Sequence, residues 1–505
     1  MTSAPSRPEP SPASRAPSRR RRAGVSVGLA LLALAALHAA GCATNPATGR
    51  REFSLVTPAQ EAAMGREGYQ AAIAEFGRYE DESLAAYVDS IGRRVARASE
   101  QPDLPWRFTV LDDPVVNAFA MPGGYIYVTR GLLAHMQSEA QLAGVLGHEI
   151  GHVTARHSAR QITKQQIAGL GLGIAGALSP SFRQHGTLAE QALGLLMLKY
   201  GRDDEHQADD LGVRYAAVAG YDPREIPGTY RTLQRIAERA GQSLPVYLST
   251  HPDPGARAER TAGLAAKAAE GRANLQVRQR GYLEKLRNLV YGENPRYGWF
   301  EGTRFYHPVL GLEMSFPGGW RTSHTHTALA AMAPDQSGVM QLTLARDAAG
   351  RSPTEYLVGL TTNGRVASSR GGPENVGPWP AWVGTLVVPD GRGGQGALLA
   401  AFIRISPDVM LQVLGRGAAP GDAGERQVLA SIRSMTQLVD PRRGMVQPVR
   451  MRVQGASAAG GFRALWPTLG AGLIPLEEAA ILNGMEPDEA VQNGQWLKLV
   501  DAPRW

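Results

Sequence analysis

Residues 148–152 read His-Glu-Ile-Gly-His, an H-E-x-x-H pattern that follows a run of apolar and small residues. Residues four apart lie on one face of a helix, so His148 and His152 can point at the same metal ion. Zinc suits two imidazoles and a carboxylate, with a fourth position left to water. Glu149 stands beside the first ligand, where its carboxylate can take a proton from that water. The pattern therefore predicts a zinc site on a helix, against the alternative of an ordinary helix with two solvated histidines.

The motif lies in a segment, residues 136–160, that is rich in helix-forming residues and contains no proline. Apolar residues recur within it at positions 142, 145, 146, 150 and 153, which is the spacing of one helix face. We therefore expect one helix over residues 136–160, with its metal-binding face at the border of the core.

A third ligand is expected from a second helical stretch, which runs from Arg202 to Ala219. Glu205 can supply it. Asp209, one turn later, can accept a hydrogen bond from the far nitrogen of a zinc-bound histidine and so fix its tautomer. His206 is the competing ligand, but it points roughly 100° away from Glu205 on a helix, so both cannot serve well.

Two further stretches flank these helices. The first is Asn117-Ala118-Phe119-Ala120-x-Pro122-Gly123-Gly124, and the second is Ser249-Thr250-His251-Pro252, followed by Arg257. With them, residues 45–270 resemble the CAAX-endoprotease and BepA-like zinc metallopeptidases of peptidase family M48.

The resemblance implies roles for individual residues. His148, His152 and Glu205 would bind one zinc ion, and Glu149 would be the general base. His251 would lie near the zinc as a latch or a transition-state donor, and Arg257 is a second candidate to help a developing oxyanion. Because the residue before a proline is driven out of helical conformation, His251 is expected on a loop, where the alternative is a histidine of the surface.

Two alternating segments, 106–111 and 125–128, are typical of strands, and the Pro122-Gly123-Gly124 turn between them predicts an antiparallel pair. The segment from Asn117 to Val128, which includes Ala118 and Phe119, is the candidate edge strand with which an extended substrate would pair. A plain core sheet is the alternative for this segment.

The N-terminus explains most of the basic charge. The chain of 505 residues has a net charge of +7, and residues 1–41 hold six arginines against one glutamate, which is five of those seven charges. The remainder lacks a basic and aromatic array, so no nucleic-acid partner is expected. An arginine run followed by an apolar stretch predicts a signal peptide over residues 1–41.

The only cysteine, Cys42, follows Ala39-Ala40-Gly41 and resembles the lipidation site of a bacterial lipoprotein. The expected location is the cell envelope, with the protein facing the periplasm, attached by a lipid anchor to the outer or inner membrane, more specifically the outer one. A transmembrane anchor or an ordinary signal peptide is the alternative. Residues 167–178 are apolar but too few to span a bilayer. Packing against the domain's own core is expected of them, and a mobile lid over the cleft or a surface-seeking hydrophobic hairpin is the alternative.

The domain organisation follows from changes in pattern. A lipidated tether over 42–57 precedes a mostly helical zinc-peptidase (gluzincin) domain with a small sheet over 58–270, and a linker over 271–303 carries a short helix at 283–290. Short alternating runs predict an α+β adaptor domain with an antiparallel sheet over 304–440, faintly similar to PsbP-like domains. Residues 445–501 resemble the second half of a LysM domain of βααβ order, which implies peptidoglycan as a partner. The fold class expected for the whole chain is α+β.

His324 and His326 lie two residues apart in the expected adaptor domain. A strand would place them on one face, so a second metal site is an alternative. Histidines solvated on a loop are the expectation.

Together these features predict a zinc-dependent endopeptidase of the bacterial cell envelope that hydrolyses misfolded or misassembled proteins in protein quality control. The alternative is a zinc-containing periplasmic chaperone or assembly factor whose proteolysis is latched off and whose tail binds peptidoglycan. An intact Glu149 favours the enzyme, because a scaffold has no need of that base.

Overall fold

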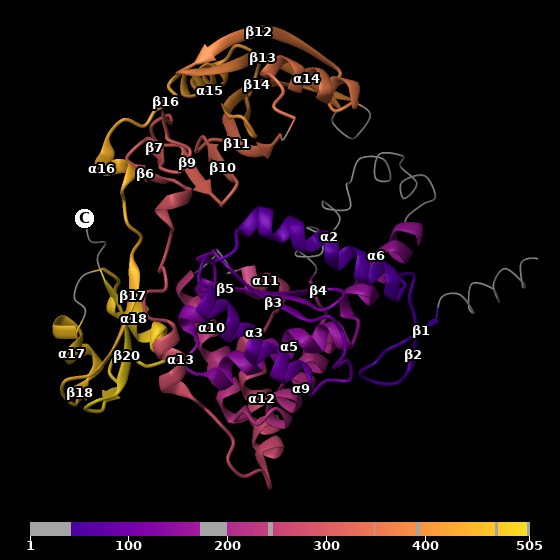
Figure 1. Ribbon diagram of the computed structural model, residues 1–505, viewed down its shortest axis with the longest axis vertical. Coiled ribbons are helices and arrows are strands. Elements are labelled where there is room, and N and C mark those ends of the chain that lie inside the picture. Colours follow the sequence, from indigo (N-terminus) through magenta and orange to yellow (C-terminus); the bar gives the residue numbers. More distant parts are fainter. Residues whose placement is uncertain are drawn as a thin grey trace, which may run out of the picture.

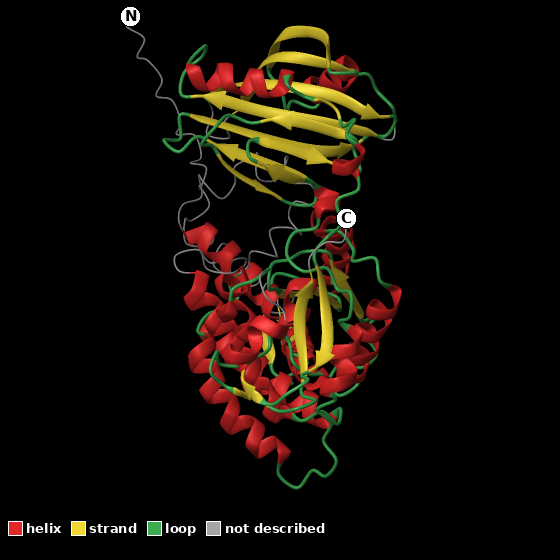
Figure 2. Ribbon diagram, turned by 90° about the vertical axis from the view of Figure 1, so that its left-hand side faces the viewer, coloured by secondary structure: helices red, strands yellow, loops and turns green. Residues whose placement is uncertain are grey.

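The structure is a computed structural model that describes residues 42–171, 199–240, 246–347, 349–389, 394–469 and 473–501. Helices and strands are mixed, with a helical part built mainly from the first half of the chain and a large sheet built from the second half (Figures 1 and 2). This arrangement agrees with the predicted α+β class. Among the described residues, no helix has both the length and the apolar content that a bilayer crossing requires.

The helical part contains ten α-helices in the described residues: α2 (Pro58–Phe76), α3 (Glu82–Ala96), α4 (Arg130–His135), α5 (Glu139–Thr154), α6 (His157–Gly171), α9 (Arg202–Val218), α10 (Ile226–Ala240), α11 (Val246–Thr250), α12 (Pro254–Ala269) and α13 (Gln279–Lys285). Side chains cap several of them. The hydroxyl of Ser138 accepts a hydrogen bond from the main-chain N–H of Gln141 and so fixes the start of α5.

The prediction of one helix over residues 136–160 was wrong. The first helix, α5, ends at Thr154, and α6 begins at His157 after a turn in which Arg156 has a φ of 54°. Tertiary contacts hold this left-handed turn, because the Arg156 guanidinium donates to Glu61 Oε2 at 3.0 Å and to the carbonyl oxygen of Val56 at 2.9 Å. Local helix propensity does not include such contacts.

A three-stranded sheet lies beside these helices. Its order is β3-β5-β4, with β3 (Arg107–Leu111), β4 (Ala118–Met121) and β5 (Tyr125–Thr129). The glycine turn joins β4 to β5 as an antiparallel pair, whereas β3 and β5 run parallel. The predicted antiparallel pairing of 106–111 with 125–128 was therefore wrong, because β4 follows β3 in the chain and takes the edge position beside β5, so that β5 pairs with β3 in parallel.

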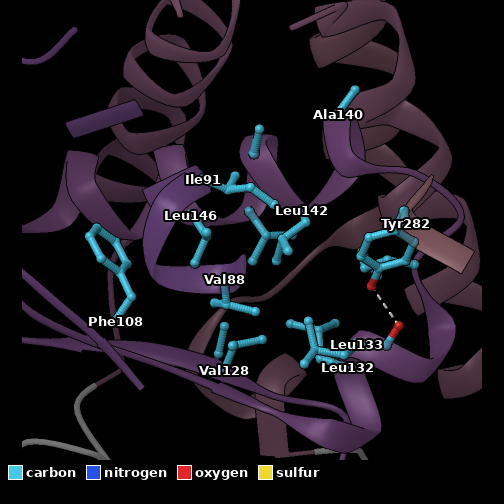
Figure 3. Packing of buried hydrophobic residues seen from close by; sticks show 14 of the residues in the cluster. Val88, Ile91, Phe108, Val128, Leu132, Leu133, Ala140, Leu142, Leu146 and Tyr282 are labelled. Atoms are coloured by element: carbon cyan, nitrogen blue, oxygen red, sulfur yellow. Dashed lines mark hydrogen bonds between the residues drawn. The ribbon is translucent and has the colours of Figure 1, made fainter. Parts of the chain in front are cut away.

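The main core lies between α3, α5 and this sheet (Figure 3). On α3 the buried apolar residues Leu84, Val88, Ile91 and Val95 recur at spacings of three and four. They form one apolar stripe that packs with Leu142 and Leu146 of α5. Fully burying a side chain of this size stabilises the fold by about 1.5–3 kcal/mol, so this stripe anchors the motif helix.

The second part of the chain forms two antiparallel sheets. A four-stranded sheet has the order β16-β8-β7-β6, with β6 (Trp299–Glu301), β7 (Arg304–His307), β8 (Leu312–Ser315) and β16 (Thr436–Gln437). A seven-stranded sheet has the order β12-β13-β14-β15-β11-β10-β9, with β9 (Arg321–His324), β10 (Ala328–Met332), β11 (Gly338–Arg346), β12 (Ser368–Val376), β13 (Trp379–Pro389), β14 (Gln395–Ser406) and β15 (Val409–Gly417).

Two helices cover opposite faces of the seven-stranded sheet. Helix α15 (Ala423–Arg433) packs over the face that holds Ala401, and α14 (Pro353–Thr362) packs over the face that holds Ala400 and Phe402. A short helix, α16 (Pro441–Gly444), follows.

The two histidines predicted to be solvated on a loop are half-buried, with His324 at the end of β9 and His326 in the turn that follows. The His326 ring lies 4.0 Å from the ring of Tyr297, and the His324 ring lies 6.0 Å from that of Phe305. Both histidines line a small cavity together with buried His307. A turn between β9 and β10 brings them to this cavity, which local sequence does not reveal.

The last residues fold in the order β17 (Arg450–Gly455), β18 (Gly460–Gly461), α17 (Phe462–Leu469), α18 (Leu476–Leu482), β19 (Ala490–Val491) and β20 (Trp496–Asp501), with β17 antiparallel to β20. This module joins the main core through Met451, Leu482 and Val500. Buried Lys498 donates to the carbonyl oxygens of Ala134 at 2.7 Å and Met136 at 2.8 Å, just before the motif helix.

Two stretches predicted as connections are packed. In the predicted linker, Tyr282 and Leu283 of α13 belong to the main core, and the Tyr282 hydroxyl donates to the carbonyl oxygen of Leu133 at 2.7 Å (Figure 3). The short helix expected at 283–290 lies at Gln279–Lys285 instead. In the predicted tether, β1 (Cys42–Thr44) and β2 (Arg51–Phe53) form an antiparallel hairpin, and Asn45 is 1% exposed.

Candidate metal centre

The site is set by the close approach of α5 and α9. Gly147 and Gly151 of α5 face Gly212 and Ala208 of α9, and a Cβ added at Gly212 would lie 2.8 Å from the main-chain nitrogen of His148. Only a residue without a Cβ permits this separation. The carboxylate of Glu205, two turns earlier on α9, therefore reaches the two histidines of α5.

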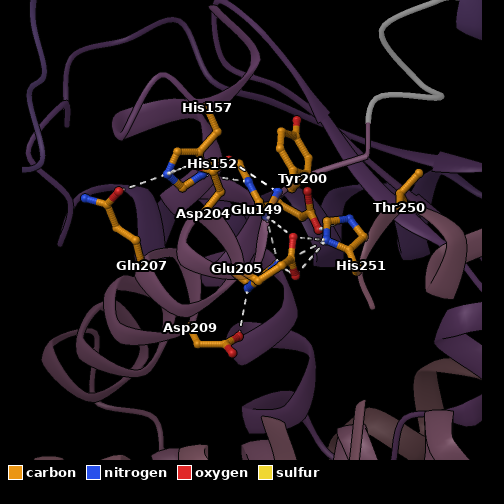
Figure 4. A network of polar contacts seen from close by, with 12 residues as sticks. Glu149, His152, His157, Tyr200, Asp204, Glu205, Gln207, Asp209, Thr250 and His251 are labelled. Carbon is orange, nitrogen blue, oxygen red and sulfur yellow. Dashed lines mark hydrogen bonds and ion pairs between the residues drawn. The ribbon is translucent and has the colours of Figure 1, made fainter. Parts of the chain in front are cut away.

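Four side chains converge at this contact, and one ligand atom from each lies within 4.8 Å of the others. Figure 4 labels three of them, His152, Glu205 and His251. His148 Nε2 is 3.0 Å from His152 Nε2. The Glu205 oxygens lie 3.6 Å from His148 Nε2 and 3.5 Å from His152 Nε2. His251 Nδ1 is 3.4 Å from His148 Nε2 and 3.0 Å from Glu205 Oε1.

These separations fit a metal ion. Nitrogen and oxygen ligands at about 2.0–2.2 Å from a tetrahedral ion lie roughly 3.3–3.5 Å from one another. The Oε1 atom of Glu149 is also buried and has no hydrogen-bond partner among the described residues. The donor set and this carboxylate oxygen are therefore suited to an ion and its ligand water.

The structure separates the two candidates for the third ligand. Glu205 is 1% exposed and lies in the cluster, whereas His206 is exposed on the other side of α9. The helical period explains this difference, because neighbouring residues point roughly 100° apart.

Burial and charge set the protonation of the carboxylates. Burial raises the pKa of Glu149 above its usual range. Burial acts in the same direction on Glu205, but the charges of His251 and Arg257 lower the pKa of Glu205 to about 2. Glu205 is therefore ionised, as a metal ligand must be, while Glu149 binds a proton more readily.

Asp209 and Arg257 lie behind the ligands. Asp209 Oδ1 is 3.1 Å from His148 Nδ1, the ring nitrogen that does not face the cluster. The Arg257 guanidinium contacts Glu205 Oε2 at 2.9 Å and Asp209 Oδ1 at 2.7 Å, and it is buried. This geometry favours a charge-balancing role for Arg257 over the predicted help to an oxyanion.

His251 lies directly after α11, and its main-chain N–H donates to the carbonyl oxygen of Tyr247 at 2.7 Å. The ring stacks on that of Tyr247 at 4.6 Å and is 1% exposed, so the alternative of a surface histidine was wrong. Its Nε2 is 3.8 Å from Glu149 Oε1. His251 thus occupies the fourth corner of the cluster.

The candidate edge strand lies against α5, with Ala118 and Phe119 in β4 and Asn117 just before it. All four residues of β4 are buried, and the Phe119 ring stacks on that of Tyr127 at 4.7 Å. Cys42 is the first residue of β1, and most of the apolar stretch 167–178 lies outside the described residues.

Sequence reasoning missed two residues that contact His152. His157 Nδ1 lies 2.9 Å from His152 Nδ1, and the Tyr200 ring stacks on the His152 ring at 4.1 Å. On one continuous helix His157 would point roughly 140° away from His152. The break at Arg156 brings it back, whereas Tyr200 carries no local signal at all.

The site has two histidines one turn apart, a glutamate beside the first of them, and a carboxylate from a following helix. This combination defines the class of H-E-x-x-H metallopeptidases. Comparison with known proteins agrees with this class. Residues 82–265 match Peptidase family M48.

Relatives share this part of the chain. The chain is 39% identical over 157 residues to the mitochondrial metalloendopeptidase OMA1 of Arabidopsis thaliana, and the aligned part covers 31% of this chain and 31% of that protein. It is 31% identical over 219 residues to OMA1 of Schizosaccharomyces pombe, covering 41% of this chain and 61% of that protein. It is 30% identical over 264 residues to the beta-barrel assembly-enhancing protease of Escherichia coli, covering 49% of this chain and 52% of that protein. The chain thus spans less than two thirds of each of these relatives.

Proposed function

We propose that this protein is a zinc-dependent endopeptidase of the bacterial cell envelope. The observation that carries the proposal is the buried cluster of His148, His152, Glu205 and His251 beside Glu149. Two imidazoles and a carboxylate are typical ligands of catalytic zinc. In this proposal His148 and His152 bind through Nε2 and Glu205 through its carboxylate.

When bound, the ion supplies a Lewis acid that acidifies water and polarises a carbonyl group. Glu149 takes the proton of the attacking water at its carboxylate and passes it to the leaving amine. Its raised pKa suits this shuttle, because a base that binds the proton too weakly cannot retain it until the amine departs. Asp209 holds the tautomer of His148 by accepting from Nδ1, and Arg257 balances the charge of both carboxylates.

His251 controls access in this proposal. Its Nδ1 stands among the ligand atoms, at 3.4 Å from His148 Nε2, where a substrate or water would otherwise approach. The residue follows a short helix and precedes a proline, so a change in this connection can move the ring without disturbing α5 or α9. Proteolysis would then be latched until His251 leaves.

The substrates proposed are misfolded or misassembled envelope polypeptides. The relatives named beta-barrel assembly-enhancing protease support a location in the cell envelope. Lipidation at Cys42, attachment to the outer membrane and binding of peptidoglycan by a LysM-like module over 445–501 extend the proposal. For the last, the module has α17 and α18 between the antiparallel strands β17 and β20, with the short pair β18–β19 also between them.

The test is cleavage of casein by the full chain purified in detergent, with bound zinc measured alongside. Glu149→Gln should keep its zinc and lose activity at least about 100-fold, as expected for a general base. His251→Ala should keep its zinc and cleave faster than the wild type if the latch is correct. His206→Ala is the matched control, because this exposed histidine adjoins Glu205, and it should match the wild type in both measurements.

The outcomes separate the two candidate functions. Zinc without cleavage in both the wild type and His251→Ala would favour the alternative, a zinc-containing chaperone or assembly factor. Its one supporting observation is the position of His251 in the resting site. Loss of zinc in His206→Ala but not in an alanine variant of Glu205 would refute the assigned ligand set.

A further inference from the structure

The proposed ligand His152 has a defined tautomer. Its Nε2 faces the ligand cluster, so in the neutral ring the proton must be on Nδ1. His157 Nδ1 lies 2.9 Å from this nitrogen, within hydrogen-bond distance. His157 Nδ1 must therefore be an acceptor, and the proton of His157 is placed on its Nε2.

The surroundings of His157 agree with this assignment. His157 Nε2 lies 3.0 Å from Gln207 Oε1, which can only accept. His157 itself is fully buried. The two proposed histidine ligands thus have different partners, since His148 faces the carboxylate of Asp209 and His152 faces a second imidazole.

The position of His157 depends on the break between α5 and α6. The amide of buried Asn45 donates to the carbonyl oxygen of Ala155 at 3.1 Å, at the end of α5. It also donates to Glu52 Oε1 at 2.8 Å, and Glu52 accepts from Arg160 of α6 at 2.9 Å. The hairpin β1–β2 therefore clamps both helices on either side of the turn that aims His157.

We propose that His157 is a positioning residue that holds His152 in its metal-binding tautomer and orientation through a hydrogen bond accepted at Nδ1. The inference rests on the proposed function, because it takes His152 Nε2 as a metal ligand. The chain His152–His157–Gln207 fixes the ring from behind, and the N-terminal hairpin fixes the helix turn that carries His157. Partners of this kind typically change metal affinity by about 10- to 100-fold when removed.

The test compares His157→Leu with His157→Asn in the full chain. The two replacements have the same branched shape, but only asparagine places an acceptor oxygen where His157 Nδ1 stands. Zn²⁺ affinity is measured by competition with a chromogenic chelator, and the visible spectrum of the Co²⁺-loaded protein reports the ligand geometry. His206→Ala serves as the control for an exposed histidine of the same region.

We expect His157→Leu to bind Zn²⁺ about 10- to 100-fold more weakly, with an altered Co²⁺ spectrum, and His157→Asn to stay within about threefold of the wild type. Equal affinity in wild type and His157→Leu would overturn the inference, and so would an equal loss in both variants at unchanged circular dichroism. If the leucine variant fails to fold, the asparagine variant decides, because a folded asparagine variant with a loss of about tenfold or more also overturns it. A wild type that binds no Zn²⁺ would instead refute the proposed function.

Discussion

Replacement of Arg257 by methionine isolates the charge balance behind the ligands. The guanidinium is 2% exposed and lies 2.9 Å from Glu205 Oε2 and 2.7 Å from Asp209 Oδ1. Methionine retains much of the buried apolar stem but removes the charge. Arg257→Met therefore leaves two buried carboxylates without their cation.

The expected loss is large in the metal-free protein. Removing one partner of a buried ion pair costs about 3–5 kcal/mol, because the other charge stays buried and uncompensated. A bound Zn²⁺ ion restores positive charge next to Glu205, so the loss should be clearly smaller in the metal-loaded protein. Arg260→Met is the matched control, because Arg260 pairs with Asp210 between the same two helices at 29% and 49% exposure. An exposed pair of this kind is worth about 0–1 kcal/mol.

Hydrogen exchange of α5 and α9 amides measures the free energy of local opening in this region without requiring the whole chain to unfold in one step. The measurement is made with chelator and with Zn²⁺ for wild type, Arg257→Met and Arg260→Met. Our reasoning is refuted if Arg257→Met is as stable as Arg260→Met in chelator. An equal loss with and without Zn²⁺ would refute the charge-balance argument in particular.

Three further predictions concern other parts of the fold. Gly212→Ala should destabilise α5 and α9 by about 1–3 kcal/mol and weaken Zn²⁺ binding, because its Cβ would meet the main chain of His148 at 2.8 Å; unchanged exchange and affinity would contradict this. Lys498→Met should lower the free energy of local opening at the end of α4 and the start of α5 by about 1–3 kcal/mol, because two buried carbonyl oxygens lose their donor. Hydrogen exchange as slow as in the wild type would contradict this. Burial lowers the pKa of His307 to about 4. Between pH 6.5 and 4 the unfolded chain therefore binds more protons at this residue than the folded chain does. The free energy of unfolding should accordingly fall by about 3 kcal/mol as the pH drops through this range. His307→Asn is the comparison, because asparagine keeps an acceptor for the Leu310 N–H but cannot titrate. Urea unfolding should show the loss of stability at low pH in the wild type but not in His307→Asn. The same pH dependence of the unfolding free energy in both proteins would contradict the prediction.

Periodicity located the helices with strong patterns and failed where tertiary contacts override it. The helix Arg202–Val218 follows the predicted range, Arg202 to Ala219, closely. The break at Arg156 was not predicted, because a left-handed turn at arginine is held by Glu61 and Val56, about a hundred positions away in sequence. The parallel pairing of β3 with β5 was missed for a similar reason, since strand order is decided by packing.

The sequence by itself determined which chemistry the site can perform. An H-E-x-x-H pattern on a helix brings His148 and His152 to one face because of the helical period, and the same period separates Glu205 from His206. Those inferences need no distant contact. Tertiary structure alone decided which further residues hold the ligands, because His157, Tyr200 and Arg257 contact them only after α5, α6, α9 and α12 have packed. For His251 the family resemblance implied a position near the zinc, but its contacts with His148 and Glu205 come from the tertiary structure, since the position of a residue that follows a short helix depends on the packing around it.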